Sequence, residues 1–165
     1  CNDSFLLVRA NTRVQMGKVE TNEKGVDLIK SMEGFSPSVY LCPAYIFTVG
    51  YGSLHGPGGD RLNRDHRDIT RDEGTELLKR DLRKTEFFVA KLVRVPLTIN
   101  QFSALVSLVF NIGSGNFQNS TLRMKLNRRD YQGCADNFWQ WRRGGGRILT
   151  GLVRRRELEK QLFLS

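Results

Sequence analysis

Glu33 is an acidic residue placed where a carboxyl group suits acid–base catalysis. A helix is predicted from about residue 22 to residue 33, because apolar residues recur on one face and Gly34 follows as a natural stop. Glu33 then lies in the last turn, where the negative end of the helix dipole disfavours the ionised form of a carboxyl group. A carboxyl group that keeps its proton near neutral pH can donate it to a leaving group, so Glu33 is a candidate general acid.

The residues after Glu33 follow a definite spacing. Eight residues separate Glu33 from Cys42, five more separate Cys42 from Thr48, and a Gly-x-Gly sequence follows at Gly50 and Gly52. This pattern resembles the signature of the phage-type lysozymes, the endolysins of glycoside hydrolase family 24, in which a Glu, an Asp (Cys in some members) and a Thr stand at these spacings. The resemblance covers about residues 21–165 and continues, in order, through Ile69-Thr70, Leu77-Leu78, Asp81-Leu82, Val95-Pro96-Leu97, Asn100-Gln101-Phe102, Phe110-Asn111-Ile112-Gly113, Ser120-Thr121-Leu122, Leu126-Asn127, Trp141, Gly151-Leu152 and Arg155-Arg156-Glu157.

The resemblance implies a muramidase that hydrolyses the β-1,4 glycosidic bond between N-acetylmuramic acid and N-acetylglucosamine in bacterial peptidoglycan and so lyses host cells. Glu33 would protonate the leaving glycosidic oxygen, Cys42 would activate or position a water on the opposite face of the sugar, and Thr48 would hold that water. In such an inverting arrangement the two catalytic groups stand roughly 6.5–9.5 Å apart, which leaves room for the water. The match also places Tyr40 and Asn111 near the substrate, and it implies neither a cofactor nor a metal ion.

Two positions depart from the family pattern. Cys42 stands where most members have an Asp, and Ser53 stands where a His often follows the Gly-x-Gly sequence. A thiol with an ordinary pKa is mostly protonated at neutral pH and is a poorer base than a carboxylate. Three alternatives therefore stay open: a lytic transglycosylase that needs only Glu33 and forms 1,6-anhydro products, a catalytically impaired protein that binds wall or nucleic acid, and a Cys42 that only fills a turn.

The cysteines and histidines form no metal-binding pattern. Cys1, Cys42 and Cys134 include no C-x-x-C pair, and His55 and His66 are isolated, which argues against a zinc site. Cys134 is predicted on an apolar helix face and should be chemically inert. Cys1 lies in an N-terminal extension of unknown order, residues 1–20, and is the candidate for a disulfide with Cys42, which predicts an enzyme active when reduced.

The elements predicted around these residues give a mostly helical α+β fold, which for the family is a two-lobed lysozyme-like architecture. Residues 21–165 are expected to form a single lysozyme-like domain with a cleft where its lobes meet. Two β-prone runs at 39–41 and 46–49, with Pro43 in the turn between them, belong to a small β-rich lobe at about residues 35–70.

Capping boxes mark the starts of two longer helices. Thr70-x-x-Glu73 opens a connecting helix at about residues 71–93, and Thr98-x-x-Gln101 opens an apolar helix that ends at Ile112. The second helix lies within a helical lobe at about residues 96–165. Further helices are predicted there at 121–128, 131–142 and 151–163, and Phe138, Trp139 and Trp141 are expected to pack in the core.

Basic residues dominate the last quarter of the chain. The 165 residues carry a net charge of +9 at pH 7, and residues 121–160 contain eleven Lys or Arg against four acids, which is +7. Such a field favours anionic partners, here polymers of the wall or the outer membrane, with Arg154-Arg155-Arg156 as the candidate surface patch. Nucleic acid is not an expected partner, because the sequence shows no zinc-finger or RNP signature. A monomer is expected.

The sequence also bears on location. The longest nearly apolar stretch, residues 99–112, is shorter than the roughly 18–20 residues of a membrane-spanning helix. Residues 1–16 show no basic-then-apolar signal pattern. The protein is therefore expected to be made in the host cytoplasm and to act on the cell wall in the periplasm, by an export route that the sequence does not reveal.

Overall fold

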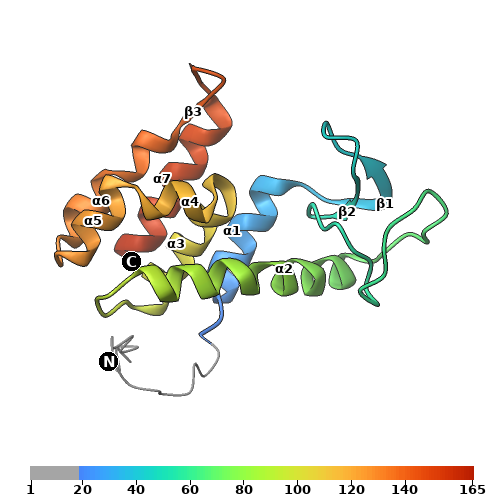
Figure 1. Cartoon of the computed structure of the whole chain (residues 1–165), viewed down its shortest axis with the longest axis horizontal. Helices are drawn as coiled ribbons and strands as arrows, with labels where there is room; N and C mark the ends of the chain where they lie inside the picture. The colour runs from blue at the N-terminus through green and yellow to red at the C-terminus, as the bar shows by residue number, and fades with distance from the viewer. Residues whose placement is uncertain (1–18) are drawn as a thin grey trace. The chain divides into compact units, whose positions relative to one another are not determined.

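A computed structural model describes residues 19–165, which have the predicted mostly helical α+β fold, with two small antiparallel sheets (Figure 1). Cys1 and nearly all of the expected extension lie outside the described residues. Two compact units are present: residues 29–83 form one, and residues 84–165 with the described start of the chain form the other. The elements are α1 (Glu23–Glu33), β1 (Ser36–Leu41), β2 (Phe47–Gly50), α2 (Arg71–Leu92), α3 (Ile99–Ile112), α4 (Ser114–Gln118), α5 (Thr121–Asn127), α6 (Tyr131–Asp136), the 3-10 helix η1 (Phe138–Trp141), β3 (Arg143–Gly144), β4 (Arg147–Ile148) and α7 (Thr150–Leu164).

The unit at residues 29–83 is built on the β1–β2 hairpin. The strands are antiparallel, with Tyr40 opposite Thr48 and Leu41 opposite Phe47. The Ile69 amide donates a hydrogen bond to the carbonyl oxygen of residue 37 (2.9 Å), which ties the end of the long loop to β1. A small core holds the hairpin against α2 and this loop, and its members are Val49, Leu62, Ile69 and Leu77, with Phe35, Val39 and Phe47 packed against them.

Both predicted capping boxes are present. The Glu73 amide donates to Thr70 Oγ1 (3.1 Å), and the Thr70 amide donates to Glu73 Oε2 (2.9 Å). The Arg67 guanidinium also binds the Glu73 carboxylate, and these hydrogen bonds lower the pKa of Glu73 to about 2. Thr98 and Gln101 cap α3 in the same reciprocal way.

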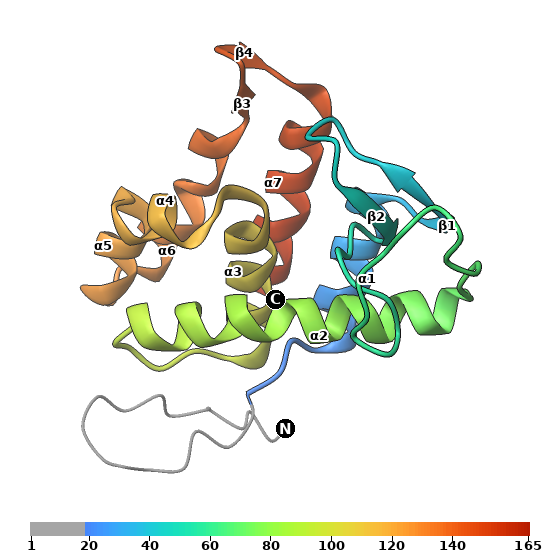
Figure 2. The same cartoon turned by 45° about the vertical axis from the view of Figure 1, so that its right-hand side comes forward.

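The second unit is organised around α3. Residues 102–109 are all buried, and α7 packs along this helix (Figure 2). Such continuous burial is expected of a helix that is apolar on most sides and lies at the centre of a helical unit. Neither α3 nor any other helix among residues 19–165 is long and apolar enough to cross a membrane.

Three buried charged side chains of α7 join it to α3. Arg155 Nε lies 3.1 Å from Glu159 Oε1, and Arg156 Nε lies 2.8 Å from Glu159 Oε2. The Ser107 hydroxyl of α3 donates to Glu159 Oε1 (2.7 Å), and Arg155 donates to the Ser107 carbonyl (3.1 Å). Burial raises the pKa of Glu159, and the two guanidinium groups oppose that shift. This group of Arg155, Arg156, Glu159 and Ser107 is called the ionic network below.

The helix predicted at residues 131–142 is interrupted at Asn137. The Asn137 side-chain amide donates to the Gly133 carbonyl (2.6 Å), and its Oδ1 accepts from Gln140 Nε2 (2.7 Å). A short polar side chain that bonds to nearby groups gives the backbone an alternative to continuing the helix. The chain therefore forms α6, and then the tighter η1, in place of one longer helix.

The β3–β4 hairpin and the short helix α4 are absent from the sequence prediction. Gly145 and Gly146 connect the two strands with φ values of 56° and 78°. Two successive residues with positive φ match a two-residue turn suited to hairpins, and such turns favour glycine. The Gly-Gly-Gly run at 144–146 is therefore the sequence signal for this hairpin.

Candidate active site

Glu33 is the last residue of α1, and its side chain is exposed. Gly34 follows with a φ of +72°, a conformation that favours glycine and that turns the chain out of the helix. The predicted position of Glu33 in the last helical turn is therefore confirmed. Its role as a general acid stays a prediction.

The Phe35 side chain packs the segment after Glu33 against Tyr51 and α2. Its ring centroid lies 5.1 Å from that of Tyr51, and the Arg71 guanidinium lies 4.8 Å from the Phe35 centroid. Gly74 in α2 makes room for the Phe35 ring, because a Cβ atom at position 74 would stand 2.6 Å from it. Glu33 therefore projects next to a segment that is packed on both α2 and Tyr51.

Cys42 begins the tight turn between β1 and β2. Its amide donates to the Ile46 carbonyl (3.0 Å), and the Tyr45 amide donates to the Cys42 carbonyl (2.8 Å). Tyr45 adopts a φ of +58°, which reverses the chain direction within the turn. Hydrogen bonding from the backbone of Ile46 and Ala44 favours the ionised thiol of Cys42 and is the main cause of its lowered pKa.

Thr48 adds a third donor next to Cys42. Thr48 is 3% exposed, and its hydroxyl donates to the Ile46 carbonyl (3.0 Å). Hydrogen bonds from Ile46, Ala44 and Thr48 lower the pKa of Cys42 below the ordinary value of a thiol. Cys42 is a free cysteine and is only half-buried, so the residue is partly open to solvent.

Tyr40 lies directly across the hairpin from Thr48 and is 42% exposed. The structure thus brings Tyr40, Cys42 and Thr48 together on one hairpin. The two amides at positions 44 and 46 are site groups that the sequence analysis missed. The turn around Pro43 was predicted, but residue types do not reveal where the amides of a turn point.

Asn111 belongs to the other unit, where it stands near the end of α3. Its Oδ1 accepts a hydrogen bond from Arg156 Nη2 (3.1 Å), so its side chain is oriented by the ionic network. Asn111 is exposed, and its contact with substrate stays a prediction.

Ser53, which replaces the His common in the family, has a structural partner. Its hydroxyl donates to Asp81 Oδ2, and the residue is 2% exposed. His55 is exposed, whereas the His66 ring is largely buried with Nε2 3.2 Å from Asp60 Oδ2. Among residues 19–165, no three His, Cys, Asp or Glu side chains are grouped so that they could hold a metal ion.

Cys134 differs sharply from Cys42. It is fully buried on α6, and desolvation raises the pKa of its thiol to about 12. A buried thiol of this kind is unreactive at neutral pH, as the sequence analysis expects. Both cysteines are free, and the predicted disulfide between Cys42 and Cys1 involves a residue outside the described part of the chain.

The predicted basic patch at residues 154–156 is wrong in two of its three members. Arg155 and Arg156 are 3% and 2% exposed, because both guanidinium groups bind the buried Glu159 carboxylate in the ionic network. Arg154 is exposed, as are the arginines of the neighbouring β3–β4 hairpin, Arg143 and Arg147. The positive surface in this part of the unit is therefore centred on the hairpin and the start of α7.

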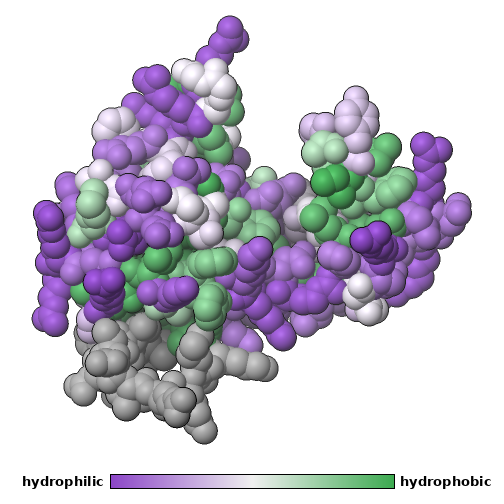
Figure 3. Space-filling model, in the orientation of Figure 1, coloured by the Kyte–Doolittle hydropathy of each residue, from purple (hydrophilic) through white to green (hydrophobic). Residues whose placement is uncertain are grey.

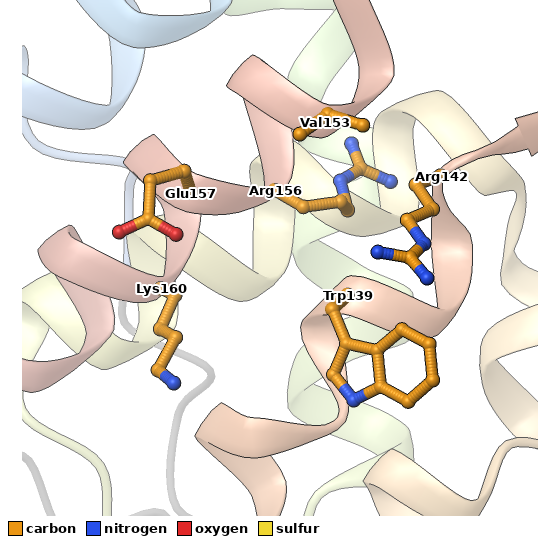
Figure 4. A pocket seen from close by; sticks show the side chains of 6 residues that line it. All are labelled: Trp139, Arg142, Val153, Arg156, Glu157 and Lys160. Atoms are coloured by element: carbon orange, nitrogen blue, oxygen red, sulfur yellow. The ribbon is translucent and has the colours of Figure 1, made fainter. Parts of the chain in front are cut away.

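Trp139 is not a core residue, in contrast to the prediction. It is 54% exposed and the Arg142 guanidinium lies 4.5 Å from the centroid of its ring, whereas Phe138 is fully buried as predicted. Trp139 lines a pocket of about 160 Å³ (Figure 4). The other lining residues are Arg142, Val153, Arg156, Glu157 and Lys160, so the pocket wall is rich in cations.

Comparison with known proteins gives the same family for nearly the whole chain. Residues 30–159 match the family described as phage lysozyme. An endolysin of Acyrthosiphon pisum secondary endosymbiont phage 1 is 40% identical over 149 residues, which cover 87% of this chain and 97% of that protein. A SAR-endolysin of Enterobacteria phage P21 is 36% identical over 133 residues, 81% of this chain and 78% of that protein.

A solved structure agrees with these sequence matches. The crystal structure of a mutant of phage P22 lysozyme superimposes with a TM-score of 0.82 at 37% identity, over 88% of this chain and 99% of that one. The fold is therefore lysozyme-like, as the sequence resemblance implies. The chain belongs to the phage lysozyme family and is a peptidoglycan-lysing muramidase, a glycoside hydrolase that acts on the bacterial cell wall.

Proposed function

We propose that the enzyme cleaves the β-1,4 bond between N-acetylmuramic acid and N-acetylglucosamine by direct displacement with water. Glu33 gives its proton to the leaving glycosidic oxygen as the bond to the anomeric carbon breaks. A water on the opposite face of the sugar forms the new carbon–oxygen bond and passes a proton to the Cys42 sulfur. Thr48 holds this water through its hydroxyl. The product is a free reducing end with inverted configuration.

The observation that carries this proposal is the set of donors around Cys42. The amides of Ala44 and Ile46 and the Thr48 hydroxyl all stabilise a thiolate, and the pKa of Cys42 is lowered accordingly. A thiol that only filled a turn would have no need of three donors. At neutral pH the lowered pKa increases the fraction of thiolate, which is the form able to accept a proton from water.

The Thr48 hydroxyl can direct its proton to different acceptors during the reaction. It donates to the Ile46 carbonyl, and rotation about its C–O bond redirects the same proton toward the Cys42 sulfur or a water. We expect Thr48→Val to lower kcat more than Thr48→Ser, because only serine keeps a hydroxyl at this position.

Analysis of reaction products tests the proposal. Wild type, Cys42→Asp and Cys42→Ala are incubated with purified peptidoglycan, and the fragments are examined by mass spectrometry. A hydrolase releases ordinary reducing ends, keeps its activity with Asp at position 42, and loses about 100-fold or more with Ala, the usual magnitude for general base catalysis. A fully active Cys42→Ala that still releases reducing ends would remove Cys42 from the mechanism.

A lytic transglycosylase is the second candidate, and the absence of a carboxylate at position 42 favours it. Such an enzyme closes the sugar on its own 6-hydroxyl and needs only Glu33 as acid and base. Its products are 1,6-anhydro sugars, which are lighter than the hydrolysis products by one water. Cys42→Ala would then keep much of its activity.

We also propose that the second unit, which contains residues 84–165, binds anionic polymers of the wall or outer membrane. The exposed arginines at the β3–β4 hairpin and the pocket beside Trp139 support this, because their positive field attracts phosphate and carboxylate groups. The pair Arg147→Gln and Arg154→Gln should weaken binding to whole cell envelopes most at low salt. Arg64→Gln with Arg83→Gln removes the same charge from the other unit and should change binding little.

We also propose where the enzyme acts and in which oligomeric state. The substrate lies outside the cytoplasmic membrane, so the enzyme acts in the periplasm, as a monomer whose residues 21–165 form one lysozyme-like domain. Relatives named SAR-endolysins are consistent with this location. Recovery of the active protein from the periplasmic fraction of producing cells would test it.

A further inference from the structure

Tyr45 combines two properties that a turn residue rarely has. Its φ of +58° lies in the left-handed region, where the Cβ of a bulky residue meets steric resistance. Its side chain is also 86% exposed, so packing within the protein does not compensate for that conformation. Arg129 has a positive φ as well, but it follows the end of α5, where left-handed residues are common.

The turn itself accounts for the backbone conformation but not for the tyrosine. The reversal at position 45 closes the turn, in which the Tyr45 amide donates to the Cys42 carbonyl and the Cys42 amide donates to the Ile46 carbonyl. Glycine adopts the same φ without steric cost and would hold the same turn. The aromatic ring therefore requires a separate explanation, because strained residues that persist are concentrated at functional sites.

The ring stands within an apolar surface. Figure 3 shows apolar surface gathered over the β1–β2 hairpin. Residues 40–46 contain no charged side chain, and Tyr40, Leu41 and Ile46 are 42%, 45% and 48% exposed. Exposed apolar patches often mark binding sites.

Two observations favour an uncharged sugar ring as the ligand of this patch. The patch adjoins the Cys42 turn, because the Tyr45 amide donates to the Cys42 carbonyl and the Cys42 amide donates to the Ile46 carbonyl, so a glycan strand bound at Cys42 has the patch within reach. Residues 29–83 contain eight basic and eight acidic residues, so this unit has no net charge to select an anion. The C–H face of a pyranose ring can stack on the electron-rich face of an aromatic ring.

We propose that the exposed Tyr45 ring is a stacking platform for a pyranose ring of the glycan strand, and that it holds the strand in register with Cys42. The inference rests on the proposed function, since it takes the strand at Cys42 to be the one that is cut. Tyr45 is thus a binding residue, and it contributes to substrate affinity while the chemical step depends on other groups.

The test separates the ring from the turn. Tyr45→Gly keeps the left-handed conformation and removes the ring, Tyr45→Phe keeps the ring, and Phe87→Ala removes a 45% exposed aromatic side chain from α2 as a matched control. Binding to purified sacculi is measured by co-sedimentation in the cold, and KM and kcat are measured on the same sacculi. The pH dependence of Cys42 alkylation reports whether the turn is intact.

Tyr45→Gly should bind sacculi about fivefold to tenfold more weakly and raise KM by a similar factor, with kcat and the Cys42 alkylation profile unchanged. Tyr45→Phe and Phe87→Ala should resemble wild type. Wild-type binding by Tyr45→Gly would overturn the inference, as would a shifted Cys42 profile, which would mean that Tyr45 acts through the turn. Full activity of Glu33→Gln would overturn the proposed function alone, because the sacculus-binding comparison does not depend on it.

Discussion

Residues 29–83 contain eight basic and eight acidic residues and carry no net charge, whereas the described part of the other unit contains fifteen and eight and carries +7. The two units also bury different polar groups. In residues 29–83 the buried polar side chains are the neutral Thr48 and Ser53. The other unit buries Arg155, Arg156 and Glu159 between its helices.

This difference separates the residues that are suited to proton transfer from the residues that hold the helices together. A group that must exchange protons needs a pKa near the working pH and access to solvent, and Cys42 has both a lowered pKa and partial exposure. The charged side chains of the ionic network lack that access to solvent, because Arg155, Arg156 and Glu159 are buried and the one carboxylate is paired with both guanidinium groups. Strong electrostatic interactions in this enzyme therefore do not identify the reactive residues.

The largest effect that tests this division is expected at Glu33. Glu33→Gln keeps the side-chain shape but removes the transferable proton, so lysis of cell walls should fall about 100- to 10,000-fold. The free energy of unfolding should hardly change, because the Glu33 side chain is exposed. Glu76→Gln, an exposed position on α2 of the same unit, should leave both properties near wild type. Turbidity loss and circular dichroism measure the two effects.

Glu159→Ala should instead lower the stability of the fold. It leaves two buried guanidinium groups without their carboxylate, and breaking a buried ion pair costs about 3–5 kcal/mol of unfolding free energy. Glu157→Ala, on the exposed side of the same helix, should cost less than about 1 kcal/mol. Urea unfolding gives both values. A loss below 1 kcal/mol for Glu159→Ala would show that apolar packing alone holds α7 on α3.

The two described cysteines offer a finer comparison between the units. Iodoacetamide at pH 7.5, roughly one unit below an ordinary thiol pKa, should modify Cys42 in the native enzyme and abolish activity. Cys134, with its pKa raised to about 12 by burial, should react only after unfolding. Peptide mapping by mass spectrometry distinguishes the sites. Equal labelling of both native thiols would contradict the assigned environments.

The smallest expected effect concerns Glu73 at the start of α2. Its pKa is about 2 in the folded protein, against an ordinary value near 4.3 when unfolded. The depressed value means that this carboxylate stabilises the fold above about pH 5 and loses the contribution as the pH falls toward 2. Melting temperatures of wild type and Glu73→Gln should differ at pH 6, differ less at pH 3, and converge only near pH 2. A constant difference would show that Arg67 and Thr70 do not act through the charge.

Helix starts were the most predictable part of the fold. The capping boxes at Thr70 and Thr98 are local chemical signals, and both helices begin where these residues place them. The break at Asn137 was not predictable from periodicity, because it depends on side-chain bonds to Gly133 and Gln140. The β3–β4 hairpin does have a local signal in the sequence, because its turn is formed by Gly145 and Gly146, which both have a positive φ.

The site was predictable as a spacing but not as a set of donors. The family resemblance singled out Cys42 and Thr48, and both lie on the β1–β2 hairpin, where Thr48 contributes to the lowered pKa of Cys42. The amides of Ala44 and Ile46 are invisible in a sequence, since every residue has one. The burial of Arg155 and Arg156 also escaped prediction, because a run of arginines looks the same whether it faces water or a buried glutamate.

The discontinuous make-up of the second unit has a consequence for the order of assembly during synthesis. Residues 29–83 are contiguous, so the hairpin and its small core can form as soon as they leave the ribosome. The other unit joins the segment before residue 29 to α3 and α7, as when the Asn22 amide donates to Ser103 Oγ (3.0 Å). Its central helix α3 lacks the packing of α7 until α7 has been translated. We therefore expect the enzyme to gain its wall-cutting ability only after α7 has been synthesised.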